Sequence, residues 1–159
     1  MATTRFLFNK FPGSINIKLL LKKCQKYITP YNFSFILSGN AVCSVFGDPH
    51  YRTFDGRLYN FQGTCKYLLA SDCSDERAFK IRVRNDGRGT TSYAWTKTLF
   101  ISLEGYEVTL LQDYVVRVNR KDVTLPYVVS PALEITMDQY VITVKTAIGK
   151  KKMMMVVRK

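Results

Sequence analysis

Apolar and polar residues alternate with a period of two along most of the chain after Cys43. The clearest run is 79–84, in which Phe79, Ile81 and Val83 are separated by basic residues. The same alternation recurs at 99–103, 106–110, 116–118, 133–137 and 140–144. Because successive side chains of a strand point to opposite faces, this period predicts strands that each bury one face.

Turn-forming residues separate the predicted strands. They are Asp55-Gly56, Asn85-Asp86-Gly87, Glu104-Gly105 and the polar run at 119–122. Short strands at spacings of roughly 8–12 residues, punctuated in this way, are typical of antiparallel sandwiches and barrels. No helical period of comparable length follows residue 43. The predicted fold class is therefore all-β, an antiparallel β-sandwich-like domain over residues 43–149.

Both ends of the chain differ from this pattern. Residues 1–42 hold six basic and no acidic residues, with Pro12-Gly13 and Pro30 as breakers. We expect a poorly ordered basic segment there, with one short helix over 15–26. Residues 150–159 hold five basic and no acidic residues and predict a basic tail, as if the domain stopped before its end.

The ends also carry nearly all of the net charge. The chain has 159 residues, the size of one domain, and a formal net charge of +12. Residues 43–149 contain 13 basic and 12 acidic residues, so the predicted domain is almost neutral. A nucleic-acid-binding fold carries its basic residues on the folded face, and this distribution argues against that class. No apolar run has the length of a membrane span, and none is a convincing signal peptide.

One segment is more specific than the rest. Residues 43–56 read Cys-Ser-Val-Phe-Gly-Asp-Pro-His-Tyr-Arg-Thr-Phe-Asp-Gly, and Phe-Gln-Gly-Thr-Cys-Lys-Tyr follows at 61–67. These motifs, with Asp72-Cys73, resemble the opening half of a von Willebrand factor type D domain, and the resemblance covers 43–148. Asn85-Asp86 and the run at 92–97 are most similar to the BMP-binding endothelial regulator (crossveinless-2) family. The Trp-Asp-Gly and Cys-Gly-Leu-Cys-Gly-Asn motifs of the family's second half are absent, so the domain is expected to be incomplete at its C-terminus.

The four cysteines are either disulfide partners or buried or free thiols in a reducing compartment, and they do not suggest a metal site. Cys24, Cys43, Cys65 and Cys73 allow three complete pairings, and their spacing is not the tight paired pattern of zinc ligands. The resemblance implies that Cys43, Cys65 and Cys73 form disulfides with cysteines of the missing half. Any bridge among these three is then expected to be non-native.

Asp48, Pro49 and His50 form a candidate self-cleavage site. An Asp-Pro bond is acid-labile because the carboxyl group attacks its own carbonyl carbon and the proline nitrogen leaves once protonated. His50, the one histidine in the sequence, changes charge in the physiological pH range and can assist that step. The resemblance implies cleavage at mildly acidic pH. The simpler alternative is a loop in which Pro49 fixes the turn and Asp48 caps it.

Three further features concern ligands. The resemblance implies that Asp48 binds calcium in the complete domain, but calcium takes 6–8 oxygen ligands, so Asp48 alone is no site. Asn32 begins an Asn-Phe-Ser glycosylation sequon. Arg82, Arg84, Arg88 and Lys97 form a basic stripe that suits sulfated glycans, for which a solvated strand face is the simpler account.

The resemblance implies a non-enzymatic extracellular binding or assembly module, from a secreted modulator of BMP signalling. Its partners would be extracellular proteins such as BMP-type growth factors, or matrix components and glycans, with no nucleic acid. The alternatives are a mucin-like or matrix protein that uses the domain for disulfide-linked assembly, and the type D module of a lipid-transfer protein. Nucleophile-elbow and phosphate-loop motifs are absent from the sequence, which argues against ordinary catalysis.

Overall fold

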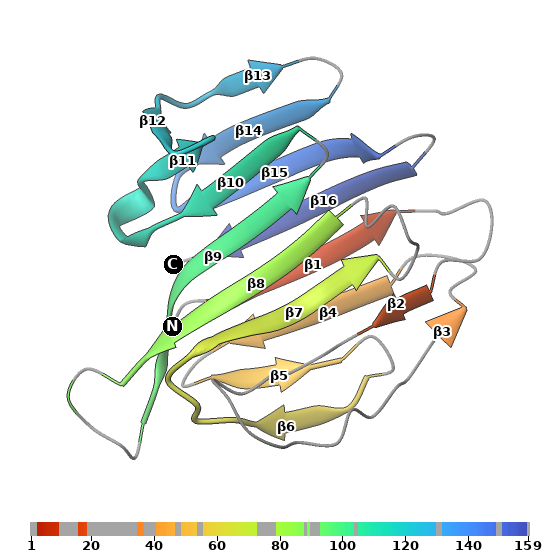
Figure 1. Ribbon diagram of the computed structural model, residues 1–159, viewed down its shortest axis with the longest axis vertical. Coiled ribbons are helices and arrows are strands. Elements are labelled where there is room, and N and C mark those ends of the chain that lie inside the picture. Colours follow the sequence, from red (N-terminus) through yellow and green to blue (C-terminus); the bar gives the residue numbers. More distant parts are fainter. Residues whose placement is uncertain are drawn as a thin grey trace.

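The protein is built from antiparallel strands arranged in two stacked sheets (Figure 1). The computed structural model describes residues 3–9, 16–18, 35–36, 41–46, 49–53, 56–72, 79–87, 89, 93–103, 105–129, 132–148 and 151–158. Its short 3-10 helix, η1 (Gln112–Tyr114), joins two strands of one sheet. No helix among these residues is both long and apolar enough to cross a membrane.

Each sheet has eight strands in the described part of the chain. The first sheet has the order β13 (Tyr127–Val129), β14 (Leu133–Asp138), β15 (Val141–Ile148), β16 (Lys151–Arg158), β1 (Thr3–Asn9), β4 (Ala41–Phe46), β5 (His50–Arg52) and β6 (Leu58–Asn60). The second has the order β12 (Lys121–Val123), β11 (Val116–Val118), β10 (Tyr106–Leu110), β9 (Trp95–Leu103), β8 (Phe79–Asp86), β7 (Lys66–Asp72), β2 (Asn16–Lys18) and β3 (Phe35–Ile36). All neighbouring pairs are antiparallel.

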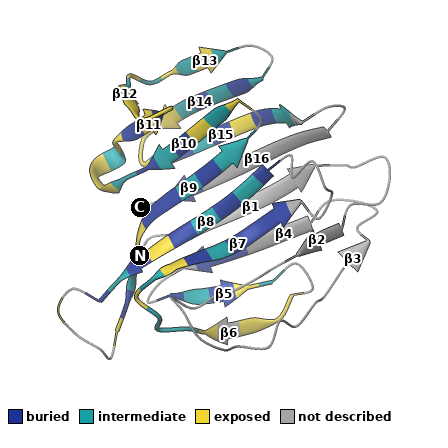
Figure 2. Ribbon diagram, viewed as in Figure 1, coloured by how far each residue is buried: buried dark blue, intermediate teal, exposed yellow. Residues whose placement is uncertain are grey.

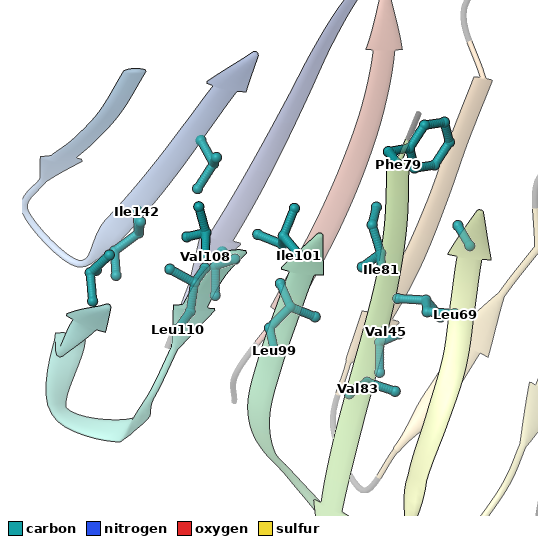
Figure 3. Packing of buried hydrophobic residues seen from close by; sticks show 14 of the residues in the cluster. Val45, Leu69, Phe79, Ile81, Val83, Leu99, Ile101, Val108, Leu110 and Ile142 are labelled. Carbon is teal, nitrogen blue, oxygen red and sulfur yellow. The ribbon is translucent and has the colours of Figure 1, made fainter. Parts of the chain in front are cut away.

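The core lies between the two sheets. Ile81, Ile101 and Val108 of the second sheet and Val45 and Ile142 of the first are at most 2% exposed and belong to one cluster (Figure 3). The apolar residues of the alternating runs thus face inward and leave water, which is the main favourable contribution to folding. The predicted fold class, an all-β antiparallel sandwich, is confirmed.

A tight turn corrects one detail of the strand pattern. The sequence pattern predicts a strand that starts at Tyr140, but β15 begins at Val141, which pairs with Asp138. The two residues between them make the turn, and Gln139 has a φ of 51°. Tyr140 is consequently 69% exposed instead of inward-facing, and Met137, at the end of β14, is 47% exposed.

Two segments that were expected to be irregular, residues 3–9 and 151–158, pair with each other as strands. Residues 151–158, expected as a basic tail, form β16, which lies between β15 and β1. β1 pairs in turn with β4, so it is an interior strand of the first sheet. A helix was expected over residues 15–26, but residues 16–18 of this segment form strand β2. Residues 15 and 19–26 lie outside the described part of the structure.

Candidate functional site

The predicted cleavage motif leads into the edge of the first sheet, at β5 and β6. Pro49 is buried, and its carbonyl accepts a hydrogen bond from the Phe61 backbone N–H at 3.3 Å. His50 pairs with Asn60 across the two strands, and its Nδ1 donates to Asn60 Oδ1 at 2.5 Å. Asp48 lies outside the described residues. The structure therefore shows how two of the three predicted cleavage residues are held, and β6 orients the imidazole ring.

The turn that joins β5 to β6 keeps this histidine in place. The Thr53 backbone N–H donates to the Arg57 carbonyl at 2.9 Å, and the Arg57 N–H donates to Thr53 Oγ1 at 3.1 Å. Gly56 has a φ of 84°, a conformation that glycine adopts without the strain of a side chain. The turn closes the hairpin and fixes the register that places His50 opposite Asn60.

A buried polar contact links the two sheets one residue further along. Tyr51 on β5 and Asn85 on β8 are each 1% exposed, and Asn85 Nδ2 donates to Tyr51 Oη at 2.8 Å. Burial raises the pKa of Tyr51 to about 12, because the phenolate would lose its hydration, and the bond from Asn85 only partly opposes this. Asn85 Oδ1 is also buried and has no hydrogen-bond partner in the structure.

Aromatic rings pack around this contact. The Phe61 ring lies edge-on to Tyr51, with centroids 6.4 Å apart, and edge-on to Tyr67, with centroids 4.9 Å apart. Tyr67 Oη accepts a hydrogen bond from the Cys65 backbone N–H at 3.1 Å. A Cβ atom on Gly63 would lie 2.1 Å from Tyr67 Oη, so the rings leave no space for a side chain there. The segment 61–67 thus serves to close this end of the core.

Cys65 is disulfide-bonded in the structure. The resemblance implies a disulfide at this cysteine, with a partner in the missing half of the domain. The side chains of Cys24, Cys43 and Cys73 lie outside the described residues. The Cys65 carbonyl accepts a hydrogen bond from the Asn85 N–H at 3.1 Å, so the disulfide adjoins the link between the sheets.

Several residues of the segment 85–97 have structural roles. Besides the buried Asn85, Asp86 forms an ion pair with Lys97, with Oδ2 and Nζ 2.5 Å apart. The Ala94 backbone N–H donates to Gln62 Oε1 at 2.8 Å. Lys97 is therefore engaged and does not belong to a free basic stripe with Arg82 and Arg84, as the sequence suggested; Arg88 lies outside the described residues.

The remaining candidates concern metal binding and glycosylation. Among the residues that the structure describes, no three His, Cys, Asp or Glu side chains gather closely enough to hold a metal ion. Asp48 and Asn32 are not among them. The Tyr51–Asn85 link has no sequence signature, because its two residues are 34 positions apart and join different sheets.

Comparison with known proteins agrees with this geometry. The chain is similar to zonadhesin from Sus scrofa (37% identity over 113 residues, 70% of this chain and 5% of that protein). It is also similar to alpha-tectorin from Mus musculus (41% over 73 residues, 44% and 3%) and to the human IgGFc-binding protein (32% over 115 residues, 69% and 2%). It spans 5% or less of the length of these relatives. The von Willebrand factor type D family matches residues 43–156, beyond the expected boundary at 149, and this chain belongs to that family.

Proposed function

We propose that this type D domain is a non-enzymatic extracellular module for adhesion or assembly, which acts through contacts with other proteins. The observation that carries the proposal is the similarity to zonadhesin, alpha-tectorin and the IgGFc-binding protein, none of which is named as an enzyme. The disulfide at Cys65 supports an extracellular location, because disulfides persist in oxidising compartments.

The geometry of the site supports a binding module. Its polar residues are occupied in holding the fold together: Asn85 spans the two sheets, and Asp86 pairs with Lys97. In the described part of the chain, the exposed large apolar side chains that offer contact area for a partner are Leu58, Tyr93, Val115, Val128, Met137 and Tyr140. Exposed apolar side chains can serve as anchors for a protein partner, whereas turnover of a small substrate needs a concave pocket with converging polar groups.

Modulation of BMP signalling is the second candidate. It rests on the similarity of Asn85-Asp86 and residues 92–97 to the BMP-binding endothelial regulator family. Asn85 and Asp86 make contacts that hold this fold together, so their presence is explained by packing without a growth-factor ligand. We therefore place adhesion or disulfide-linked assembly first and BMP modulation second.

One experiment separates the two candidates. The chain is secreted from cultured cells, its mass is measured by light scattering with and without reductant, and its binding to an immobilised BMP-type growth factor is measured in parallel. Assembly predicts oligomers that reductant dissolves, with no growth-factor binding. A monomer that binds the growth factor would favour the second candidate. A monomer that does not bind the growth factor would contradict both disulfide-linked assembly and BMP modulation.

We also propose that the Asp48–Pro49 bond breaks at mildly acidic pH. The Asp48 carboxyl oxygen attacks the Asp48 carbonyl carbon, the C–N bond breaks, and the proline nitrogen leaves with a proton. Water then opens the resulting cyclic anhydride to restore both carboxyl groups. Support comes from His50, adjacent to this bond and oriented by Asn60.

Mass spectrometry after incubation at about pH 5.5 tests this proposal. We expect a fragment that starts at Pro49, and we expect it to form more slowly in His50→Gln and Asn60→Ala. The Asp48→Asn variant is the control that removes the attacking carboxylate. An intact wild-type chain would overturn the proposal.

A further inference from the structure

Four basic side chains gather on the outer face of the second sheet. Lys80, Arg82 and Arg84 alternate along β8 with the buried Phe79, Ile81 and Val83, so they point away from the core. Lys66 on the neighbouring strand β7 is paired in register with Arg84. We call Lys66, Lys80, Arg82 and Arg84 the basic face; it lies on β7 and β8, whose alternating burial is visible in Figure 2.

Strand geometry sets the spacing within the basic face. Every second residue of a strand lies about 7 Å further along, so the three β8 cations span about 13 Å. Lys66 lies beside one end of this row, about 5 Å across the ladder from Arg84. Four positive charges at these separations repel one another, and an anion that contacts several of them relieves that repulsion.

The four cations of the basic face differ from other basic residues of the described chain in their ion pairing. Among the described residues, none of the four makes an ion pair, whereas Lys97, Arg117 and Lys145 are paired with Asp86, Asp122 and Glu134. Partial burial and the nearby Arg82 and Arg84 lower the pKa of Lys66, and Glu107 on β10 partly opposes this shift. Arg82 donates to Ser102 Oγ at 3.2 Å, while its Nε is buried without a partner.

The surroundings of the basic face select among anionic partners. Phe100, opposite Arg82 in the register, has Lys66 Nζ 3.5 Å from its ring centroid, so that face of the ring is covered. Single-stranded nucleic acids need open aromatic faces on which bases stack. Protein partners need apolar anchors, and among the described residues no exposed large apolar side chain lies on β7, β8 or β9. A sulfated glycan needs neither, because its charge is carried by sulfate oxygens along a flexible chain.

We propose that the basic face binds the sulfate groups of a sulfated glycan. Arg82 and Arg84 present planar guanidinium groups that suit oxyanions, and Lys66 and Lys80 add point charges beside them. The inference rests on the proposed extracellular location, where such glycans occur. The basic face contains none of the exposed apolar residues that were proposed above as contact area for a protein partner.

Binding of the full chain to immobilised heparin, at several salt concentrations, tests the site. The test variant is Lys66→Gln/Lys80→Gln/Arg84→Gln, which leaves the half-buried Arg82 in place. The control is Lys97→Gln/Arg117→Gln/Lys145→Gln, which removes the same charge from cations that already have partners. We expect the test variant to lose about tenfold or more in affinity and its salt slope to fall by about three, with the control within about twofold of wild type.

Three outcomes would overturn the proposal. The first is wild-type protein that does not bind heparin. The second is an equal loss in both variants, which would assign binding to net charge and the basic ends of the chain. The third is equal binding to desulfated heparin, or tighter binding to a single-stranded DNA of matched charge.

Lysine acetylation of the wild-type chain provides a test that needs no variant. Heparin is expected to protect Lys66 and Lys80 from acetylation but not Lys97 or Lys145, as read by mass spectrometry. Equal protection of all four lysines would contradict the site. Light scattering on the same variants separates this inference from the proposed function: oligomers that persist in the test variant show that assembly stands without the glycan site.

Discussion

The Tyr51 hydroxyl group and the Asn85 side chain form a polar contact between the two sheets, next to Pro49 and His50 in the sequence. The hydroxyl group accepts a hydrogen bond from Asn85 Nδ2, and both residues are almost completely buried. A buried amide that loses its partner keeps the full cost of desolvation. Asn85 Oδ1 is already without a partner, so this residue depends on the bond that remains.

Replacing Tyr51 by Phe is expected to destabilise the protein by about 1–3 kcal/mol, because Asn85 then has no side-chain hydrogen bond. Urea unfolding monitored by circular dichroism measures this loss. Tyr93→Phe, at a side chain that is 55% exposed, is the matched control and should change stability by less than about 0.5 kcal/mol. Equal stability of the two variants would contradict a structural role for the Tyr51–Asn85 bond.

The alkaline stability of the protein should also depend on Tyr51. Its pKa is raised from 10.0 to about 12 in the folded state, so the folded protein holds the proton more tightly than the unfolded chain. The resulting stability is complete below about pH 10 and is lost as pH rises toward about 12, a decline of about 2–3 kcal/mol. The free energy of unfolding is measured at pH 9, 10 and 11 for wild type and Tyr51→Phe. The contribution of Tyr51 is the difference between the two proteins in how steeply this free energy falls with pH. Parallel curves would show that another group is responsible.

At the scale of elements, the segment between β6 and β7 acts as a closure for one end of the sandwich. Phe61 packs against Tyr51 and Tyr67, and Cys65 donates to Tyr67 and accepts from Asn85. The backbone passes so close to these rings that only glycine fits at position 63. Packing therefore explains the residues of the family motif in this segment, which also served to identify the family.

Gly63→Ala is expected to cost about 1–3 kcal/mol, the usual range for an added methyl group in a well-packed site. The added Cβ would meet Tyr67 Oη and the Phe61 ring, and the buried Tyr67 cannot move aside without losing its bond to Cys65. Thermal unfolding measures the effect, at about 2–4 °C per kcal/mol for a domain of this size. Thr64→Ala, at an exposed neighbour, should leave the midpoint almost unchanged. A shift of similar size in both variants would contradict the close approach.

At the scale of the whole molecule, the first sheet is continuous because β16 lies between β15 and β1. Thr3 pairs with Arg158 and Ile148 with Lys151, so the two ends of the described chain lie side by side in one sheet. A strand at this position satisfies backbone groups on both of its sides. Its loss would open two new sheet edges and expose the core around Val144.

A chain that ends at Gly149 should therefore fail to unfold cooperatively and should self-associate, since unpaired strand edges promote aggregation. Light scattering and denaturant unfolding test this expectation. The variant Lys151→Gln/Lys152→Gln keeps the strand but removes two basic charges, and it should unfold like wild type. If the truncated chain folds normally, the segment is a tail, as the sequence pattern suggested.

Much of the fold is predictable from short-range pattern. Alternation at 79–84 correctly identifies which side chains of β8 are buried, because strand geometry is local and the apolar face must leave water. The motif at 43–56 correctly indicates the type D family. In the candidate site, the sequence indicated a turn at Asp55-Gly56, but the pairing of β5 with β6 that holds His50 came from the structure.

The rest depended on contacts between residues far apart in the chain. β1 and β16 are separated by almost the whole sequence, so their basic, irregular segments gave no sign of an interior pairing. Asn85 and Tyr51 meet only because two sheets stack, and no periodicity reports that stacking. The members of the basic face also depend on long-range contacts. The β7–β8 register places Lys66 beside Arg84, and the ion pair with Asp86 engages Lys97.

The sequence by itself determined which residues face the core in alternating strands such as β8, since that choice is made locally by hydrophobicity. Only the tertiary structure decided which strands are neighbours and which charges remain unpaired, because long-range packing sets those distances.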